Sequence, residues 1–258
     1  MFSWLKKTKK ETLAPKELPI EDFRDVDAVC DYFKKLTGVT FEKQQSILKS
    51  KLTSFCKQRE IYSFDLLIQK TQQEPLLRQE LIDYLTTNET YFYREFQQIE
   101  QLVASVKNSS QSVKILCAPC ATGEEPYSIA IALLEAGVNP THFSILGIDI
   151  NSNAIEKAKI ALYKERNIRN LSAEILMRYF TKTDERFALK KEIKDKVAFK
   201  VINIFDEEFT KLERFDYIFS RNMLIYFDST TKQRAQEILK GQLKGSQSQI
   251  YFGHADLY

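Results

Sequence analysis

The sequence predicts an α/β protein in which a Rossmann-like, doubly wound parallel sheet follows an all-helical domain. Short apolar runs rich in β-forming residues recur in the second part of the chain, at Val113–Cys117, Phe143–Ile150, Val197–Ile204, Phe215–Ser220 and Gln249–Phe252. Helical patterns lie between them, at Glu124–Glu135, Ala154–Tyr163 and Thr230–Leu239. Strands that alternate with helices form parallel sheets, and ligands of such sheets bind outside the carboxyl ends of the strands. We therefore look for a site there.

The first part of the chain has a helical apolar period and no strand pattern. The first helix is indicated by Val26, Val29, Tyr32, Phe33 and Leu36, and Gly38 is placed to end it. Three further helices are expected around Ile47–Phe55, Leu66–Ile68 and Leu76–Leu85. We expect a helical domain over residues 22–87 and an α/β domain over 88–258. Residues 1–21 are expected to be a flexible basic tail, either a disordered leader or a weak membrane-surface or partner contact.

Composition narrows the class of protein. The chain has 258 residues, is 43% hydrophobic and has a net charge of +3, so composition gives no indication of bulk nucleic-acid binding. No run approaches the roughly 20 apolar residues that cross a bilayer, and no signal-peptide core follows the N-terminus. Four cysteines do not make a disulfide scaffold. These features predict a cytoplasmic globular protein without stable membrane insertion.

Two strand ends carry candidate ligand-binding residues. The first strand runs into the segment APCATGEEPYSIA, where a loop leads into a helix, as in nucleotide sites. The loop has only Gly123 and lacks a G-x-G-x-x-G pattern, so it is suggestive and not diagnostic. The second strand ends at Asp149, whose carboxylate is well placed to accept hydrogen bonds from ribose hydroxyls. An equally good reading of Asp149 alone is a cap of the following helix.

Four separated segments resemble the CheR-type chemotaxis receptor methyltransferases: TTNETYFYRE (86–95), CATGEEPYSIA (120–130), GIDIN (147–151) and FDYIFSRNMLIYFD (215–228). FGHAD near residue 254 is similar to the family's G-H-S-E. The resemblance spans residues 22 to 256 and implies a class I methyltransferase sheet, S-adenosylmethionine as cofactor and S-adenosylhomocysteine as product. It also implies methylation of receptor glutamates, to methyl esters, in sensory adaptation.

The resemblance assigns site residues position by position. Arg94 and Tyr226 are expected nearest the methyl group, as catalytic residues. Cofactor-binding residues are expected at Asn88, Thr90, Arg94, Glu124, Glu125, Asp149, Asn203, Ile204, Asn222 and Met223. Of the two adjacent glutamates, Glu125 is preferred over Glu124. No general base is needed, because a glutamate with a pKa near 4.3 is already ionised at pH 7.

A cysteine pair and a group of basic residues bear on metal binding, redox chemistry and partner binding. Cys117 and Cys120 form a C-x-x-C, but without a second cysteine pair we expect no metal and no redox role. Basic residues of the second helix are either a solvated face or a dock for acidic receptor helices, namely Lys43, Lys49, Lys51, Lys57 and Arg59. We expect a monomer that binds no nucleic acid.

Two departures from the family pattern lead to further expectations. Family members that bind a receptor C-terminal peptide carry a glycine-bearing loop in a small β-subdomain, here expected at about 179–201. No glycine occurs between Gly147 and Gly241, so no peptide tether is expected. The family's final β-hairpin is also expected to be absent, which would leave the strand Gln249–Phe252 at an open sheet edge.

Two other functions remain open. The chain could methylate a different protein or a small acid, or it could be a receptor-associated module that binds cofactor without turnover.

Overall fold

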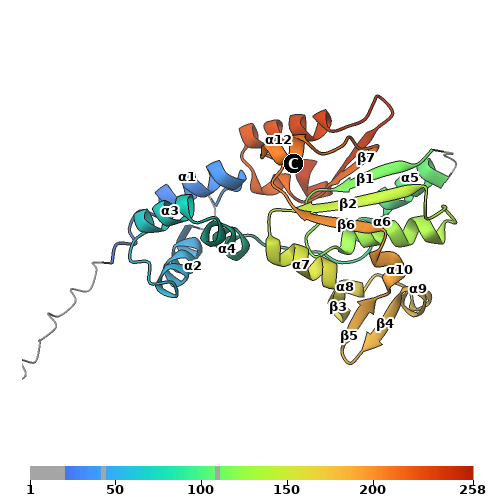
Figure 1. The fold of residues 1–258 in the computed structure, drawn as a ribbon, viewed down its shortest axis with the longest axis horizontal. Helices are drawn as coiled ribbons and strands as arrows, with labels where there is room; N and C mark the ends of the chain where they lie inside the picture. The colour runs from blue at the N-terminus through green and yellow to red at the C-terminus, as the bar shows by residue number, and fades with distance from the viewer. Residues whose placement is uncertain (1–20, 42–44, 108–110, 258) are drawn as a thin grey trace, which may run out of the picture.

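The computed structural model describes residues 21–41, 45–107 and 111–257. The tail at 1–20 and Lys43 lie outside the described residues. Figure 1 shows two lobes side by side, a small helical lobe (blue to teal) and a larger lobe built on a sheet. A hairpin-bearing subdomain extends from the larger lobe.

The helical lobe contains four helices, α1 (Val26–Thr37), α2 (Gln45–Lys57), α3 (Phe64–Gln73) and α4 (Pro75–Leu85). Gly38 adopts a left-handed conformation (φ 80°) and its N–H bonds to Lys34, which ends α1 as the sequence predicts. The helices bury one apolar cluster of their own, centred on Phe33, Leu52 and Phe55. The separate core supports treating this segment as a domain.

The main sheet has five parallel strands in the order β6-β2-β1-β7-β8. Their bounds are β1 (Val113–Cys117), β2 (Phe143–Asp149), β6 (Val197–Val201), β7 (Tyr217–Ser220) and β8 (Gln249–Phe252). Successive strands run outward from β1 on one side and then from β7 on the other. The chain order therefore reverses between β1 and β7, and the carboxyl ends of these two strands flank a crevice suited to a ligand.

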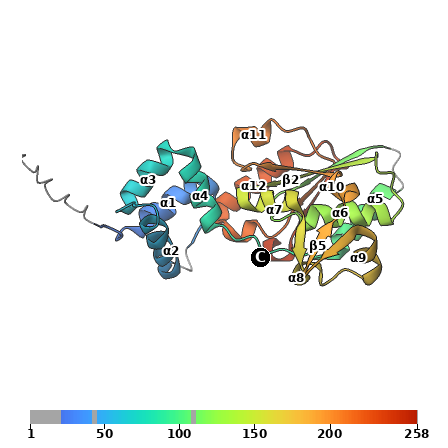
Figure 2. The ribbon, with the colours of Figure 1, turned by 60° about the horizontal axis from the view of Figure 1, so that its bottom comes forward.

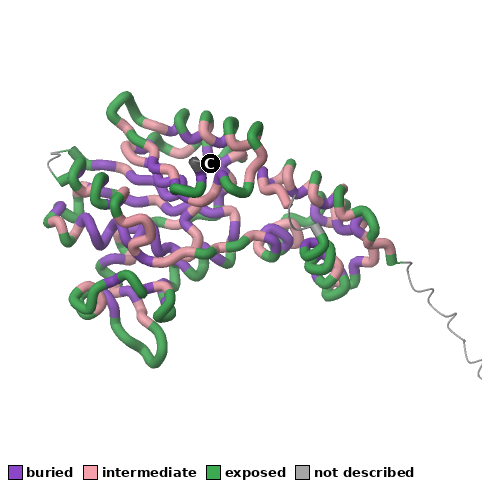
Figure 3. The backbone as a smooth tube through the Cα atoms, turned by 180° about the vertical axis from the view of Figure 1, so that it is seen from behind, coloured by how far each residue is buried: buried purple, intermediate pink, exposed green. Residues whose placement is uncertain are grey.

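Helices cover both faces of the sheet, as Figure 2 shows. One face packs against α5 (Phe96–Lys107), α6 (Glu124–Glu135) and α7 (Ser152–Ile160), and the other against α11 (Glu207–Thr210) and α12 (Ser229–Gly241). Figure 3 shows the buried residues running through the strands and the inner sides of the helices. The sequence predicts α6 with its observed bounds, but the prediction lacks α5, although Ile99, Leu102 and Val106 give it a helical apolar period.

The small subdomain overlaps the predicted range of about 179–201 but has different bounds. Its three-stranded antiparallel sheet consists of β3 (Leu162–Lys164), β5 (Arg186–Leu189) and β4 (Phe180–Thr183), accompanied by α8 (Glu165–Ile168), α9 (Ala173–Tyr179) and α10 (Lys191–Lys194). It therefore begins at Leu162 and not near Tyr179. Residues 197–201 pair in parallel with β2 and belong to the main sheet. The bounds of the predicted range, 179–201, are wrong. Pairing between strands that are far apart in sequence decides which residues belong to the subdomain and which to the main sheet.

Two single-turn 3₁₀ segments complete the fold, η1 (Leu224–Tyr226) after β7 and η2 (His254–Leu257) after β8. No helix among the described residues is long and apolar enough to cross a bilayer.

Candidate active site

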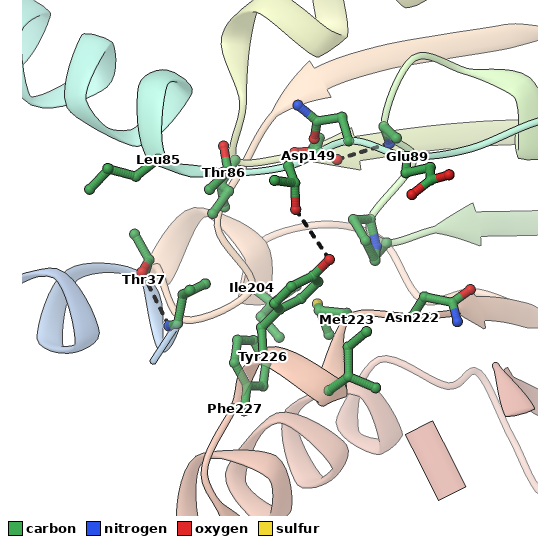
Figure 4. A pocket seen from close by; sticks show the side chains of 18 of the residues that line it. Thr37, Leu85, Thr86, Glu89, Asp149, Ile204, Asn222, Met223, Tyr226 and Phe227 are labelled. Atoms are coloured by element: carbon green, nitrogen blue, oxygen red, sulfur yellow. Dashed lines mark hydrogen bonds between the residues drawn. The ribbon is translucent and has the colours of Figure 1, made fainter. Parts of the chain in front are cut away.

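A pocket of about 750 Å³ lies between the helical lobe and the carboxyl ends of the strands. This volume is in the range of small-molecule sites. Its walls come from the end of α1, from α2, from the segment that follows α4, and from the loops after β1, β2, β6 and β7. Figure 4 shows Tyr226 reaching across it, with Asp149 on the opposite wall and Asn222 and Met223 on the loop after β7.

The structure brings the predicted site residues together, with one exception. The pocket is lined by Asn88, Thr90, Arg94, Glu125, Asp149, Asn203, Ile204, Asn222, Met223 and Tyr226. They come from five separate segments of the chain. Glu124 does not line the pocket.

Glu124 instead faces the subdomain. Its Oε1 accepts a hydrogen bond from Asn167 Nδ2 at 2.7 Å, and its Oε2 accepts one from Thr122 Oγ1 at 2.6 Å. Burial raises the pKa of this carboxyl to about 7. Adjacent helical residues point about 100° apart, so when Glu125 faces the pocket its neighbour must face elsewhere. Glu124 is thus removed from the cofactor-binding candidates.

Asp149 ends β2 and is buried in the floor of the pocket. Its Oδ2 accepts the N–H of Ala121 and its Oδ1 accepts the N–H of Asn151, each at 2.9 Å. The capping of α7 falls to the side chain of Asn151, which accepts the N–H of Ala154. Burial raises the pKa of Asp149 to about 6. Each oxygen keeps a second lone pair, so the carboxylate can still accept hydroxyl donors from a ligand.

Glu125 lies in the first turn of α6, which begins after the loop from β1. Gly123 caps this helix with φ +92°, and a β-carbon there would lie 3.0 Å from Ala158 Cβ, so the tight turn requires glycine. Glu125 Oε2 accepts a hydrogen bond from Arg221 Nε. Its buried Oε1 accepts none from any nitrogen or oxygen of the described residues, and the thiol of Cys117 is a weak donor beside the carboxylate. A buried carboxylate oxygen with no stronger donor than a thiol suits a ligand N–H or ammonium donor.

Arg221 is a site residue that sequence reasoning missed. It lines the pocket, is only 6% exposed and pairs with Glu125. Its Nη2 donates to the carbonyl of Arg94 at 2.8 Å and its Nη1 to that of Glu95 at 3.2 Å. The sequence did contain a signal for Arg221, because this residue directly precedes Asn222 in one of the four family-like segments. Arg221 therefore joins α6, β7 and the segment that carries Arg94.

The segment of Arg94 is a tight turn, with φ +57° at Tyr93 and +47° at Glu95. Non-glycine residues rarely adopt such angles, and surrounding contacts must hold them. The contacts are those of Arg221 and a hydrogen bond from Tyr93 N to Ser128 Oγ at 3.0 Å. The Arg94 guanidinium extends to the pocket and donates to the carbonyl of Glu89 at 3.2 Å. Its position is thus fixed by its neighbours.

Tyr226 connects the two lobes. Its hydroxyl lies 3.2 Å from Thr87 Oγ1, within hydrogen-bond distance, and its carbonyl accepts the N–H of Thr40 at 2.8 Å. Asn203 also crosses between lobes, since its Nδ2 donates to the carbonyl of Leu36 at 2.8 Å. The helical lobe therefore closes one side of the pocket.

A second set of hydrogen bonds between the lobes lies at the start of α7. Asp83 on α4 accepts hydrogen bonds from the N–H and the hydroxyl of Ser152, at 2.7 and 2.5 Å. Asn151 Nδ2 donates to Thr86 Oγ1 at 2.8 Å. These bonds fix the start of the segment that follows α4 and lines the pocket.

The loop after β7 is held by Asp256. Its buried carboxylate accepts the N–H groups of Asn222, Leu224, Ile225 and Gly253. Asn222 has φ +61°, so this loop too needs external support. The FGHAD segment is thereby explained: its aspartate shapes the loop that presents Asn222 and Met223 to the pocket.

The helical lobe supplies pocket residues that no sequence motif indicated, including Val39, Phe41, Ile47 and Lys51. Of the basic residues predicted on the second helix, Lys51 lines the pocket and Lys57 pairs with Glu21. Arg59, which follows α2, pairs with Glu80 over the ring of Phe55. Cys117 and Cys120 are buried free thiols with raised pKa values owing to burial. No group of three or more metal-binding side chains is found in the described part of the chain.

Comparisons with known proteins identify the family of this chain. The family described as "CheR methyltransferase, SAM binding domain" matches residues 88–257. A chemotaxis protein methyltransferase of Campylobacter jejuni is 33% identical over 249 residues, covering 96% of this chain and 92% of the relative. One from Borreliella burgdorferi is 33% identical over 83% of this chain and 81% of its own. Chemotaxis protein methyltransferase 2 of Vibrio cholerae is 32% identical over 88% and 83%. The chain thus belongs to the CheR methyltransferase family and is an S-adenosylmethionine-dependent methyltransferase.

Proposed function

We propose that the chain methylates glutamate side chains of chemotaxis receptors in the cytoplasm, giving glutamate methyl esters and S-adenosylhomocysteine. One observation carries the proposal: Arg94 and Tyr226 line the same pocket as two buried carboxylates, Asp149 at the end of β2 and Glu125 in the first turn of α6. The names of the relatives support a role in chemotaxis.

The buried carboxylates suit the cofactor. Asp149 keeps acceptor capacity toward the pocket, which suits the two ribose hydroxyls. Glu125 Oε1 has no nitrogen or oxygen donor among the described residues, which suits the ammonium of the methionine moiety. Asn203 and Ile204 are proposed beside the adenine, and Asn88, Thr90, Asn222 and Met223 along the remaining walls.

The cofactor supplies a methyl group on a positively charged sulfur, which an acceptor carboxylate can take up without a general base. The work of the protein is then to bring that carboxylate in and to exclude water. Arg94 attracts and orients the carboxylate, and the Tyr226 hydroxyl donates a hydrogen bond to it. Tyr226 is 41% exposed, as a group that meets an incoming protein side chain must be. Tight binding of the carboxylate would stabilise the ground state and slow the transfer. These residues therefore position the carboxylate without binding it tightly.

The partner proposed is the acidic cytoplasmic helix of a receptor, bound by a monomer without a C-terminal peptide tether. Lys49 and Lys51 on α2 support docking of an acidic helix near the pocket, since Lys51 lines it. Such electrostatic docking weakens with added salt.

Labelled S-adenosylmethionine with receptor cytoplasmic fragments tests the function, with base-labile methyl esters as the readout. Arg94→Ala is expected to abolish transfer while weakening S-adenosylhomocysteine binding less. Arg186→Ala, which alters an exposed arginine of β5, is the control and is expected to retain full transfer. Near-normal transfer by Arg94→Ala contradicts the role of Arg94. Cofactor binding without transfer to any receptor favours a binding module, and transfer only to other acids favours a different acceptor.

A further inference from the structure

A tyrosine ring beside the pocket carries two arginines. The guanidinium carbon of Arg169 lies 3.8 Å from the ring centroid of Tyr91, and that of Arg94 lies 5.8 Å from the same centroid. Arg94 reaches the pocket, whereas Arg169 is exposed and directly follows α8 of the subdomain. Tyr91, Arg94 and Arg169, here called the Tyr91 surface, therefore connect the pocket to the subdomain.

The Tyr91 surface is held by hydrogen bonds beneath it. Asn167 of α8 donates from Nδ2 to the carbonyl of Thr90 at 3.4 Å, and its own carbonyl accepts the N–H of Phe92 at 2.8 Å. The same Nδ2 donates to the buried Glu124. These bonds attach α8 to the chain on both sides of Tyr91. Arg169 is thus held at a set place relative to the pocket.

Arg169 is also a cation with an unused binding face. Arg178, another arginine of the subdomain, pairs with Glu135. By contrast, within the described ranges no ion pair joins Arg169 to a carboxylate; it donates to the carbonyl of Arg166. Stacking on an aromatic ring orients a guanidinium while leaving most of its donors available. A pre-positioned guanidinium binds a carboxylate at a lower cost in side-chain entropy than a mobile one.

Building on the proposed function, we propose that the Tyr91 surface is a receptor-binding surface, on which Arg94 meets the glutamate to be methylated and Arg169 binds a second carboxylate of the same receptor helix. The two guanidinium carbons can be no farther apart than their distances to the shared ring allow, about 10 Å. In an α-helix, a residue four positions away lies about 6 Å along the axis and one seven positions away about 10 Å. This upper limit admits a second carboxylate four residues from the methylated glutamate and, with the reach of the side chains, one seven residues away. We take these two spacings, both on the same helical face, as the proposed charge pattern.

A receptor-binding surface with two such arginines selects substrates by their charge pattern. An acceptor glutamate that has an acidic residue four or seven positions away is methylated faster than one with neutral residues there. Since the contact is between solvent-exposed charges, the preference declines as salt is added.

The test uses the full chain and a receptor cytoplasmic fragment with one methylatable glutamate and an acidic residue at the fourth or seventh position. Arg169→Glu is expected to lower kcat/KM about tenfold or more, mainly through KM, because attraction becomes repulsion. The dissociation constant of S-adenosylhomocysteine, measured by calorimetry, is expected to stay unchanged. Changing the second acidic residue of the receptor to lysine is expected to restore methylation by Arg169→Glu.

Arg186→Glu is the matched control, since it reverses an exposed arginine on β5 of the same subdomain that makes no ring contact with Tyr91 among the described residues. It is expected to keep the wild-type KM. The inference is overturned if Arg169→Glu behaves like this control, or if its loss is not restored by the reversed receptor charge, which would indicate a purely structural role for Arg169. These outcomes are separate from failure of the proposed function, in which the wild-type chain would methylate no receptor fragment.

Discussion

Arg221 and Glu125 form an ion pair that is buried in the wall of the pocket, with Arg221 only 6% exposed. The same guanidinium donates to the backbone of Arg94 and Glu95. Burial raises the pKa of Glu125, and the charge of Arg221 opposes that rise. The pair links a proposed cofactor-binding carboxylate to the turn that presents the proposed catalytic arginine.

Removing one partner of this pair should be costly. Arg221→Met is expected to lower the free energy of unfolding by about 3–5 kcal/mol, because it leaves Glu125 buried without a counter-charge. The double variant Glu125→Leu/Arg221→Met is expected to be more stable than the single variant, although it should not bind cofactor. Urea unfolding measures both. Arg178→Met, at an exposed pair, is the control and should cost under about 1 kcal/mol. A double variant that is no more stable than Arg221→Met would contradict the coupling.

Asp149→Asn is expected to weaken S-adenosylhomocysteine binding about tenfold or more, because a charged acceptor is replaced by a neutral amide. Burial raises the pKa of Asp149 to about 6, and hydroxyl donors favour the ionised form. The affinity of the wild type should therefore fall as the pH is lowered from 7.5 through 6. The variant should not show this pH-dependent fall. Calorimetry at several pH values checks both points. Asp184→Asn, an exposed change, should alter neither.

Glu124→Gln is expected to stabilise the protein at alkaline pH. Burial raises the folded-state pKa of Glu124 from 4.5 to about 7. The stability that the protonated form contributes is fully present below pH 4.5 and is lost as the pH rises through 7. The variant should match the wild type near pH 5 and exceed it by up to about 3 kcal/mol at pH 8. Melting curves from pH 5 to 8 test this, with exposed Glu156→Gln as the control. A constant difference across this range would refute it.

Asp256→Asn is expected to lower stability by about 1–3 kcal/mol and to weaken cofactor binding, since an amide NH₂ would face backbone N–H donors of the loop after β7. Asp256→Glu keeps a carboxylate, as in the family's G-H-S-E, and should retain more activity than the asparagine variant. Thermal melting and methyl transfer together measure the effects. Equal activity of the two variants would show that acceptor charge at this position is unimportant.

The predictable part of the fold had local signals. The run Val113–Cys117 and the period of Glu124–Glu135 match β1 and α6 in their bounds, and Gly38 ends α1 as expected. The subdomain lacked such a signal. Leu162 continues an apparently helical pattern, yet Ala161 adopts φ +55° and Leu162 pairs with Ala188. That pairing depends on contacts between residues distant in sequence, which a local pattern does not contain.

The sequence by itself determined most of the order of helices and strands, the strand-end position of Asp149 and, through its motifs, the family and ten of the residues that line the pocket. Only the tertiary structure decided which of two adjacent glutamates faces the pocket, because helix rotation sends Glu124 toward Asn167 and Glu125 toward Arg221. Tertiary contacts also brought Thr40 and Leu36 of the helical lobe onto Tyr226 and Asn203. Such contacts form between residues that are separated by more than 160 positions, and chain folding alone makes them neighbours.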